Sequence, residues 1–370
     1  MIKINLNMGI GKIPIPIVKK NDKVKRGQKI AKEIEDALSV PIYSSVNGIV
    51  EYVDDKKIII NQTDRNMDFI PINKKGSLWE TVREAGIVGM GGAGFPTYIK
   101  LKNDLKNKGY LLINASECEP ILSHNLLQIE QNPEEFISAI SVIKDSVNAK
   151  IAFIGMKFIH KKEIKKVTSV LKEKNIKDIR VFPLRNLYPV GEERALIRDV
   201  LNKKLDVDKL PDAANAIVIN SETCFSIYEA KKYHKPLIDK YITVAGNFNN
   251  LEKEEVVCKK YPIGTLFEDI IEEFGGVKED TSEIVIGGPY TGHTMLNKEA
   301  VSKTSGGILA SVSVEKENTK TGIIKCACGP SKERLYHIAN LMGADVIAYE
   351  ICKNAVEMKK GAYKCKDPGV

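Results

Sequence analysis

The sequence predicts a multidomain α/β protein, and three observations support this. The chain has 370 residues, which is long for a single core, so two or three domains are expected. Residues 77–239 alternate apolar runs with amphipathic helical stretches, a pattern that predicts a mostly parallel sheet flanked by helices. Short apolar runs with glycine turns precede this region, and a cysteine-bearing segment follows it.

Residues 1–70 are expected to form an all-β unit. Short apolar runs alternate here with turns such as Gly27-Gln28 and Asn47-Gly48. Their spacing resembles that of the barrel-sandwich domains of lipoyl and biotinyl carriers. A carrier needs a lysine at a hairpin tip, in a pattern such as AMKM or DKA, and residues 31–40 contain neither. We therefore expect a structural or docking domain rather than a swinging arm.

A glycine-rich stretch is the main candidate site of the middle region. Four glycines fall within residues 89–94, where missing Cβ atoms let backbone N–H groups approach a phosphate or lie under a planar ring. The predicted strand 110–113 then ends in Asn114, followed by Glu117 and Glu119. Ligands of open α/β sheets bind at such strand ends. The pattern indicates an anionic cofactor, and a simple tight turn is the alternative.

Two further stretches have the same character. Residues 188–193 (YPVGEE) open a predicted helix, and residues 219–223 (INSET) end an apolar run ahead of another helix. We expect all these motifs at strand-to-helix junctions, where helix N-termini favour phosphate. Glu119 or Glu193 can set the stacking of a nicotinamide for hydride transfer. The alternative for such a glutamate is a charge that interacts with the helix dipole.

The motifs GMGGAGFPTYIKL, INASECEP, YPVGEE and INSET, in this order, resemble the flavin- and NADH-binding subunits typified by RnfC of the Rnf electron-transport complex and NuoF of respiratory NADH dehydrogenase. The resemblance implies FMN and NADH as cofactors, with the glycine loop against FMN and NADH stacked on the flavin. It implies a Rossmann-like α/β flavin domain over residues 75–240. The implied cofactor-binding residues are Gly89, Gly91, Gly92, Ala93, Gly94, Phe95, Lys100, Asn114, Glu117, Glu119, Gly191, Glu192, Glu193, Asn220 and Thr223.

Residues 241–300 read as strand, helix and strand with glycine turns, and they resemble the β-grasp (SLBB-like) domain that follows the flavin domain in this family. Apolar runs cover 241–246 and 284–286, and a helix is predicted to end at Phe274. We interpret Gly287-Gly288 as a tight turn ahead of a proline rather than as a phosphate site.

Residues 301–370 are expected to form a small βαβ region that carries cysteines. A strand ends at Cys326 and Cys328, a helix covers 331–342, and a second strand ends at Cys352. A right-handed crossover makes the strands parallel and brings these cysteines to one edge. Because a proline precedes the helix, we also predict that the helix N-terminus lowers the pKa of the Cys328 thiol.

Three interpretations of the cysteine region stay open. The first is a dithiol relay that exchanges with a partner's thiol or selenol. The second is an iron–sulfur cluster or another metal site, although CxC with distant cysteines is not a standard ferredoxin spacing. The third is ordinary buried cysteines. The candidate catalytic residues, or cluster ligands, are Cys326, Cys328, Cys352 and Cys365.

The cysteine end refines the family resemblance. RnfC continues into ferredoxin-like CxxCxxCxxxCP motifs that this sequence lacks. A CACG end is most similar to the group typified by PrdC, electron-transfer proteins associated with D-proline reductase in amino-acid-fermenting anaerobes. This resemblance implies electron transfer from NADH, through FMN, to a proline reductase-like selenoenzyme. Because members of the group can carry selenocysteine, we hypothesise that one follows the sequence at its C-terminal end.

Composition narrows the partners and the compartment. The net charge of +8 comes mainly from lysine-rich helices with interspersed acidic residues, which indicates a solvated face rather than nucleic-acid binding. We see neither a signal peptide nor an apolar run near 18 residues, so we expect a cytoplasmic protein without a membrane segment. In a reducing compartment, seven cysteines favour reactive thiols or metal ligands over disulfides.

The sequence therefore predicts an electron-transfer protein that passes reducing equivalents from NADH, through FMN, to a thiol or selenol acceptor. One alternative is an RnfC-like subunit working with the other subunits of an electron-transport complex. A second is a non-catalytic adaptor with a vestigial flavin site. A homo-oligomer is compatible with each of these.

Overall fold

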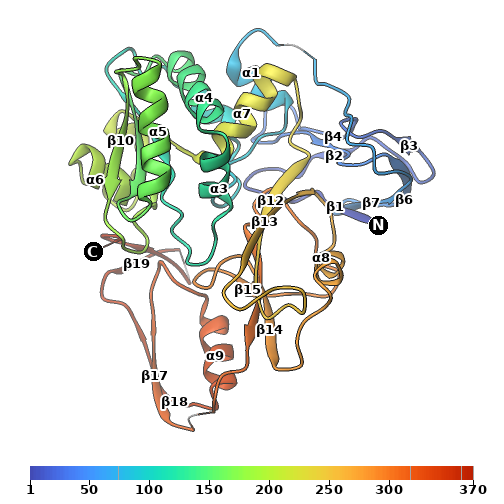
Figure 1. The fold of residues 1–370 in the computed structure, drawn as a ribbon, viewed down its shortest axis with the longest axis vertical. Coiled ribbons are helices and arrows are strands. Elements are labelled where there is room, and N and C mark those ends of the chain that lie inside the picture. Colours follow the sequence, from blue (N-terminus) through green and yellow to red (C-terminus); the bar gives the residue numbers. More distant parts are fainter. Residues whose placement is uncertain (74, 317, 360, 370) are drawn as a thin grey trace.

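The computed structural model describes residues 1–73, 75–316, 318–359 and 361–369. Figure 1 shows four parts: an N-terminal β unit (blue), an α/β unit (cyan to yellow), a third unit built on a mixed sheet (yellow to orange), and a C-terminal lobe (red) below the α/β unit. The predicted mixed α/β architecture is confirmed.

The N-terminal unit is all-β, as predicted. One antiparallel sheet has the order β1-β7-β6-β3, and the second has the order β2-β4-β5. Alternate side chains of β1 and β7, among them the register partners Ile4 and Ile58, point to one face of the first sheet and are buried there. The strands are β1 (Ile2–Asn5), β2 (Ile15–Pro16), β3 (Lys23–Val24), β4 (Lys29–Lys32), β5 (Ile42–Tyr43), β6 (Gly48–Val53) and β7 (Lys57–Gln62).

The α/β unit is built on a four-stranded sheet of order β10-β9-β8-β11, in which every neighbouring pair is parallel. Its strands are β8 (Tyr110–Asn114), β9 (Ile151–Lys157), β10 (Ile179–Leu184) and β11 (Ala216–Asn220). Its helices are α1 (Leu78–Glu84), α2 (Thr97–Leu101), α3 (His124–Gln131), α4 (Pro133–Ser146), α5 (Lys161–Glu173), α6 (Glu193–Leu201), the 3-10 helix η1 (Pro211–Ala214) and α7 (Ser221–Tyr233).

Both faces of this sheet are covered, because successive side chains of a strand point to opposite faces. Leu111 and Ile113 of β8 belong to the main apolar core, which includes residues of α4 and α7. Leu112 belongs to a second cluster that contains Leu196 and Ile197 of α6. The sheet edge that carries Asn114 and Asn220 is therefore held rigidly from two sides.

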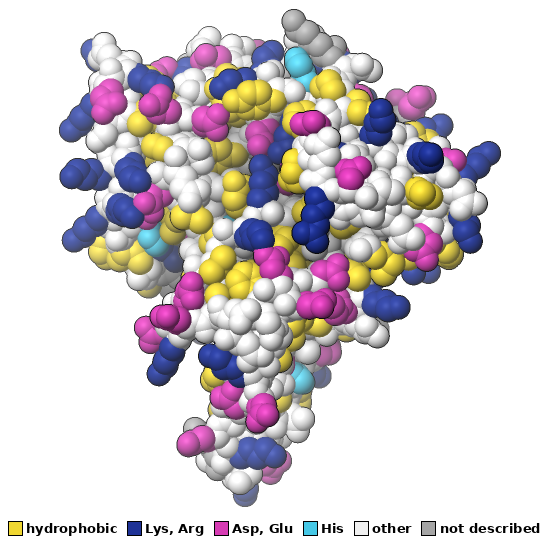
Figure 2. Space-filling view, turned by 45° about the vertical axis from the view of Figure 1, so that its right-hand side comes forward, with side chains coloured by type: hydrophobic (Ala, Val, Ile, Leu, Met, Phe, Trp, Pro, Cys, Tyr) yellow, Lys and Arg dark blue, Asp and Glu magenta, His cyan; other side chains and the backbone are white. Residues whose placement is uncertain are grey.

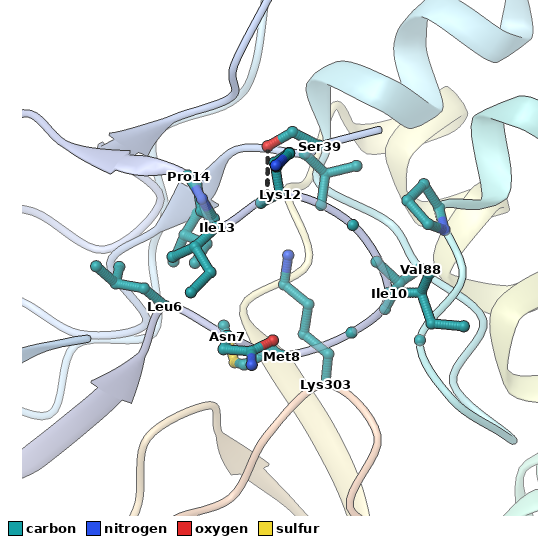
Figure 3. A pocket seen from close by; sticks show the side chains of 16 residues that line it. Leu6, Asn7, Met8, Ile10, Lys12, Ile13, Pro14, Ser39, Val88 and Lys303 are labelled. Atoms are coloured by element: carbon teal, nitrogen blue, oxygen red, sulfur yellow. Dashed lines mark hydrogen bonds between the residues drawn. The ribbon is translucent and has the colours of Figure 1, made fainter. Parts of the chain in front are cut away.

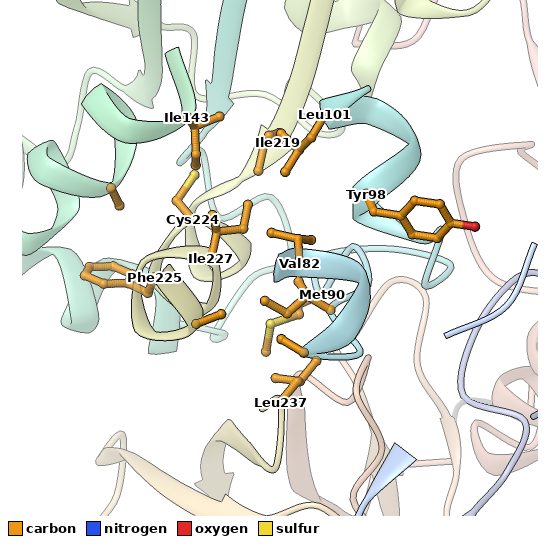
Figure 4. Packing of buried hydrophobic residues seen from close by; sticks show 14 of the residues in the cluster. Val82, Met90, Tyr98, Leu101, Ile143, Ile219, Cys224, Phe225, Ile227 and Leu237 are labelled. Atoms are coloured by element: carbon orange, nitrogen blue, oxygen red, sulfur yellow. The ribbon is translucent and has the colours of Figure 1, made fainter. Parts of the chain in front are cut away.

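The glycine-rich loop joins α1 to α2, which corrects our expectation of a strand-to-helix junction there. An isolated bridge between Val88 and Pro96 closes the loop, and the Gly89 N–H donates to the Phe95 carbonyl over 2.9 Å. Met90 is buried, and Figure 4 shows it within the apolar cluster that also includes Val82. One apolar side chain thus anchors an otherwise small-residue loop to the core.

The third unit has a mixed sheet of order β13-β12-β16-β14-β15. Its elements are β12 (Asp239–Gly246), β13 (Val256–Pro262), α8 (Phe267–Glu273), β14 (Thr281–Ile286), β15 (His293–Thr294) and β16 (Gly307–Val312). The central strands β12 and β16 are parallel, and each has an antiparallel neighbour. β16 lies beyond residue 300, where we expected this unit to end. Its β-grasp identity stays a prediction.

The C-terminal lobe has the predicted strand–helix–strand order. β17 (Lys320–Lys325) and β18 (Asp345–Ile351) are parallel, and α9 (Lys332–Leu341) connects them. A hairpin of β19 (Ala355–Lys359) and β20 (Ala362–Cys365) follows.

Buried polar contacts join the first three units. The Lys303 ammonium, from the third unit, donates to the Pro41 carbonyl of the β unit over 3.3 Å and to the Gly86 carbonyl of the α/β unit over 2.7 Å. Figure 3 shows Lys303 pointing into a small cavity lined by the loop that carries Met8. The cavity volume is about 30 Å³, which suits a water molecule and excludes a cofactor.

The surface mixes charges of both signs. On the face seen in Figure 2, lysine and arginine side chains lie among aspartate and glutamate side chains. Two lysines of α5, Lys162 and Lys166, lie 2.6 and 3.2 Å from Glu130 of α3. In the described parts of the chain, no helix is both long and apolar enough to cross a bilayer.

Candidate flavin site

Two asparagines lie side by side at the carboxyl edge of the parallel sheet. Asn114 ends β8, Asn220 ends β11, and the two are register partners. The Asn220 side-chain oxygen caps α7 by accepting from the N–H groups of Glu222 (2.9 Å) and Thr223 (3.3 Å). The Asn114 amide donates to the Gly191 carbonyl over 2.8 Å. The sheet therefore brings the INASECEP, YPVGEE and INSET motifs together.

The glycine loop lies against Asn220. A Cβ added at Gly91 would come within 2.5 Å of the Asn220 Nδ2 atom, whereas one added at Gly92 would have nothing within 4 Å. The Met90 N–H donates to the Thr223 hydroxyl over 3.1 Å, which fixes the loop on α7. Gly91 is thus required by packing, and exposed Gly92 leaves one open face above the loop.

The end of the loop packs on the N-terminal unit. Gly94 has a φ of +71°, and a Cβ there would lie 2.6 Å from the Gly9 Cα. Ala93 is exposed, and Phe95 contributes its carbonyl to the closing hydrogen bond with Gly89. The loop is therefore shaped by its neighbours on both sides.

Gly191 lies in a tight polar corner that includes a cysteine. Its N–H donates to the Cys118 sulfur over 2.8 Å, and a Cβ on Gly191 would come within 2.8 Å of that sulfur and 2.9 Å of Asn114 Nδ2. Ser116 donates to Asn114 Oδ1 over 2.7 Å. Burial is the largest influence on the Cys118 thiol and raises its pKa. The sequence motif contained Cys118, but the family pattern did not single it out.

Lys100, Glu192 and Glu193 hold secondary structure in position. The Lys100 ammonium donates to Glu193 over 2.6 Å and to the Val218 carbonyl over 2.9 Å. Glu192 is the N-cap of α6, and its carboxylate accepts from the N–H groups of Arg194 and Ala195. In this structure these charges link α2, α6 and β11, beside the sheet edge that carries Asn114 and Asn220 (the asparagine edge).

Glu119 is bound to the third unit. Its carboxylate accepts from the Tyr290 N–H over 2.9 Å and from the Thr291 hydroxyl. A Cβ on Gly288 would collide with the same carboxylate, and the Gly292 N–H donates to the Gly288 carbonyl, as a turn requires. Glu119 therefore connects the α/β unit to the turn after β14. In this arrangement a nicotinamide would have to displace Tyr290 and Thr291 to reach the Glu119 carboxylate.

Glu117 belongs to a buried polar network that sequence reasoning missed. Its carboxylate accepts from the Asn125 N–H over 3.1 Å, and burial raises its pKa to about 8. Glu222, nearby, pairs with the fully buried Lys240 ammonium over 2.6 Å, and His124 Nε2 lies 3.6 Å from the same carboxylate. Burial lowers the pKa of His124. INSET contained Glu222, but its partners come from α3 and β12.

The site residues fit an FMN molecule in their chemistry. FMN presents a phosphate, ribityl hydroxyls and a flat ring, and the edge offers open glycine backbone, two side-chain amides and a helix N-terminus. Two buried hydroxyls close to the motifs, Thr97 Oγ1 and Ser221 Oγ, have no hydrogen-bond partner within the described residues. Such groups are normally satisfied, and both belong to segments that adjoin this edge, Thr97 after the glycine-rich loop and Ser221 after Asn220.

The cysteine lobe docks on the YPVGEE motif. The Tyr188 hydroxyl donates to the Cys328 carbonyl over 2.6 Å, and Arg194 donates to the Cys365 carbonyl over 2.8 Å. The Cys352 N–H donates to the Lys325 carbonyl, so the strand ends meet at one edge as predicted.

The predicted pKa of Cys328 is wrong in direction. Burial, followed by the neighbouring thiols of Cys326 and Cys365, raises the pKa of the Cys328 thiol. The helix begins only at Lys332, with Ser331 as its N-cap, so its N-terminus lies too far along the chain to offset burial.

Among residues 1–73, 75–316, 318–359 and 361–369, no three His, Cys, Asp or Glu side chains are placed to hold a metal ion. The cysteine-rich C-terminal region is nevertheless compatible with an iron–sulfur cluster, which stays a prediction, and we derive no step through one.

Comparisons with known families match this architecture. Residues 1–76 match the RnfC barrel sandwich hybrid domain, and residues 82–229 match the Nuo51 FMN-binding domain. The α/β fold is similar to a chain in the crystal structure of an NAD⁺-reducing [NiFe]-hydrogenase in the H₂-reduced state, with a TM-score of 0.51 and 16% identity over 63% of this chain and 46% of that chain. This second likeness concerns the fold alone.

Relatives at higher identity agree with the domain matches. The chain is 29% identical to the cobalamin reductase PduS of Citrobacter freundii, over 62% of this chain and 49% of that protein. It is 32% identical to a subunit of the proton-translocating ferredoxin:NAD(+) oxidoreductase complex of Clostridium ljungdahlii, over 81% of this chain and 68% of that protein. The predicted resemblance to RnfC and NuoF is confirmed, whereas that to the PrdC group stays a prediction. The chain belongs to the RnfC-like family and combines an RnfC barrel sandwich hybrid domain with a Nuo51 FMN-binding domain.

Proposed function

We propose that this protein transfers electrons from NADH, through FMN bound at the asparagine edge, to a partner protein in the cytoplasm. The observation that carries the proposal is the meeting of Asn114, Asn220 and the glycine loop at the carboxyl edge of the parallel sheet. When bound, FMN accepts a hydride and releases electrons singly or in pairs.

The chain's own residues would orient the cofactor and keep water away from it. The open backbone at Gly92 offers a flat surface, and the Asn220 amide lies beside it. The positive end of the α7 dipole favours an anion nearby, while the N–H groups of Glu222 and Thr223 are already capped by Asn220. Burial raises the pKa of Glu117 to about 8, so this carboxyl adds little negative charge to its buried surroundings beside Asn125 near neutral pH.

A direct test reconstitutes the protein with FMN without oxygen and then adds NADH. We expect one FMN per chain and bleaching of the flavin absorbance band. Asn114→Ala should weaken FMN binding, because it removes the amide that connects β8 to Gly191, whereas exposed Asn103→Ala is the control. Failure of the wild-type chain to take up FMN would favour the adaptor alternative.

The partner follows from two lines of argument. Relatives of this chain are subunits of ferredoxin:NAD(+) oxidoreductase complexes, which favours an electron-transport complex as the setting. A thiol acceptor such as D-proline reductase is the second candidate, because four cysteines of the lobe are free and two of them, Cys328 and Cys365, contact the α/β unit through their carbonyls. Pull-down against each purified partner, with NADH oxidation as the readout, separates the two candidates.

A further inference from the structure

The turn after β14 covers a carboxylate of the candidate flavin site. This turn, residues 287–292 (GGPYTG), belongs to the third unit. Its Tyr290 N–H donates to one oxygen of the Glu119 carboxylate over 2.9 Å, and the Thr291 hydroxyl donates to the other oxygen. Glu119 follows Asn114 in the INASECEP motif. Both oxygens of this carboxylate are therefore engaged by another unit of the chain.

The same turn contacts the YPVGEE motif. The Tyr290 ring packs edge-on against the Tyr188 ring, with the ring centroids 4.6 Å apart and the planes at 63°. Tyr188 precedes Gly191, whose carbonyl accepts from the Asn114 amide. The turn therefore contacts two of the motifs that meet at the asparagine edge.

The contacts that hold the turn on these motifs are accessible to water. The Tyr290 side chain is 42% exposed, and Thr291 is exposed as well. Hydrogen bonds at an exposed site are exchanged for bonds to water at a small net cost. In contrast, Ile286 at the end of β14 and Ile308 of β16 are buried in the core of the third unit. The turn can therefore leave Glu119 while the sheet behind it stays folded.

The backbone of the turn is suited to such a movement. The Gly292 N–H donates to the Gly288 carbonyl over 2.8 Å, so the turn holds its own shape. Gly287 has a φ of +101°, and its N–H donates to the Gly307 carbonyl of β16. Glycine changes its backbone angles at little steric cost, and loop hinges are often residues of this kind. Gly287 is thus the point about which the turn would pivot.

We propose that residues 287–292 form a gate over the nicotinamide end of the NADH site, in which Tyr290 and Thr291 hold Glu119 until the dinucleotide displaces them. This inference rests on the proposed function and adds to it the residues that control access. The nicotinamide carboxamide carries two N–H donors, which would take the places of the Tyr290 N–H and the Thr291 hydroxyl on the Glu119 carboxylate. The gate therefore competes with the ligand for one acceptor.

The direction of a mutational effect separates a gate from a scaffold. If the turn only held Glu119 in the correct place for the dinucleotide, removing a contact of the turn would weaken binding. A gate predicts the opposite, because the binding-competent open form becomes more populated.

Three variants apply this criterion. Thr291→Val removes one donor and keeps the shape of the side chain, so we expect binding to strengthen about threefold to tenfold, as for the loss of one competing hydrogen bond. Glu119→Ala also frees the turn but removes the acceptor, so binding should weaken about tenfold. Thr265→Val is the matched control, since the Thr265 hydroxyl donates to the Pro262 carbonyl in another part of the third unit, and it should bind like the wild type.

The measurement uses the full-length chain with FMN added and two probes. Tetrahydro-NAD keeps the carboxamide but donates no hydride, and ADP-ribose lacks the nicotinamide ring. Isothermal titration gives their affinities, and hydrogen–deuterium exchange reports on the amides of residues 287–292. We expect tetrahydro-NAD to speed exchange of the Tyr290 amide and ADP-ribose to leave it unchanged. Thr291→Val should speed this exchange without any probe.

Weaker or unchanged binding of tetrahydro-NAD by Thr291→Val would overturn the gate, as would a Tyr290 amide that stays protected when the probe is bound. Equal release of the turn by ADP-ribose would also overturn it, because the nicotinamide end would then not be what displaces the turn.

The gate and the electron-transfer function can fail separately. Flavin bleaching by NADH in a chain whose turn stays protected would refute only the gate. Release of the turn by tetrahydro-NAD without bleaching by NADH would refute only electron transfer to FMN. A chain that binds neither probe would refute both.

Discussion

At the scale of single residues, Gly91 and Gly92 are neighbours with different surroundings. Gly91 is packed against the Asn220 amide, whereas Gly92 faces open space. A side chain at Gly91 would clash with Asn220 and destabilise the protein, whereas a side chain at Gly92 would hinder only a ligand that lies on the loop.

We therefore expect Gly92→Ala to weaken FMN binding by about tenfold or more, which corresponds to about 1.4 kcal/mol, with a melting temperature close to that of the wild type. FMN fluorescence quenching and thermal denaturation measure the two quantities. Gly322→Ala in β17, where a Cβ meets only the Ala348 Cβ at 3.8 Å, is the control. Unchanged FMN affinity in Gly92→Ala would place the flavin elsewhere.

Glu117 should make stability fall as pH rises. Burial raises its folded pKa to about 8 from a usual value near 4.5, so between these values the folded state holds a proton that the unfolded state has lost. The free energy of unfolding should decline across this window by at most about 1.4 kcal/mol per pH unit. Glu117→Gln keeps an acceptor for the Asn125 N–H and should flatten the decline in urea titrations from pH 5 to 8. An equal slope in both proteins would contradict the assignment.

Individual side chains also show which features of the site could be predicted from the sequence and which could not. Asn114 and Asn220 could be named because each ends an apolar run, and β strands that end together put their last residues together. The pairing of Glu222 with Lys240 required knowing that β12 folds back beside α7. The raised pKa of Cys328 required the docking of the lobe on Tyr188. Both depend on burial created by distant segments.

At the scale of elements, the N-cap residue of α7 has two structural roles. Asn220 caps the helix and lies over Gly91. Because α7 begins inside the candidate site, a change at Asn220 affects both the stability of this helix and the conformation of the glycine-rich loop.

Replacing this cap should affect both properties. Asn220→Ala removes the capping oxygen and should cost about 1 kcal/mol of stability, together with a loss of FMN affinity. Ser331→Ala removes the cap of α9 and should cost a similar amount of stability while FMN affinity stays unchanged. Urea denaturation and FMN titration of both variants make the comparison. Equal FMN affinity in the two variants would assign Asn220 to helix stability alone.

Most regular elements of the α/β unit followed from the apolar pattern. The strand β8, Tyr110–Asn114, ends within one residue of the predicted run 110–113, since buried parallel strands are nearly continuous apolar stretches. The position of the glycine-rich loop between two helices could not be predicted from the apolar pattern. α1 and α2 are short helices, and so brief a periodic signal does not distinguish a helix from a strand before the loop.

At the scale of the whole molecule, a buried ion pair connects the first unit to the start of the third. The Arg26 guanidinium of the β unit pairs with both oxygens of Asp239, the first residue of β12, at 2.8 and 2.7 Å. Lys235 lies 3.0 Å from the same carboxylate. Burial opposes ionisation of Asp239, but the two cations together outweigh it and lower its pKa.

Breaking this pair should destabilise the assembled units. Asp239→Asn leaves Arg26 buried without its counter-charge, so we expect a loss of about 3 to 5 kcal/mol at pH 7. Because the folded pKa is depressed, the stabilisation is present above the unfolded pKa and is lost as pH falls through the folded value. The gap between the two proteins in denaturant titrations should therefore close below about pH 4. Asp208→Asn, which breaks an exposed pair with Lys209, should cost less than about 1 kcal/mol.

The position of Lys303 bears on how this protein can be divided. One ammonium from the third unit serves carbonyls of both the β unit and the α/β unit, so a cut after the β unit separates a buried cation from one acceptor and exposes the other. A fragment made of residues 1–76 alone would lose this contact together with the Arg26 pair. The smallest piece that keeps every one of these bonds runs from the first strand through β16. Any gene fusion, swap or crystallisation fragment would have to carry these three units together, and removing the cysteine lobe would in turn break the Arg194–Cys365 and Arg334–Glu283 contacts.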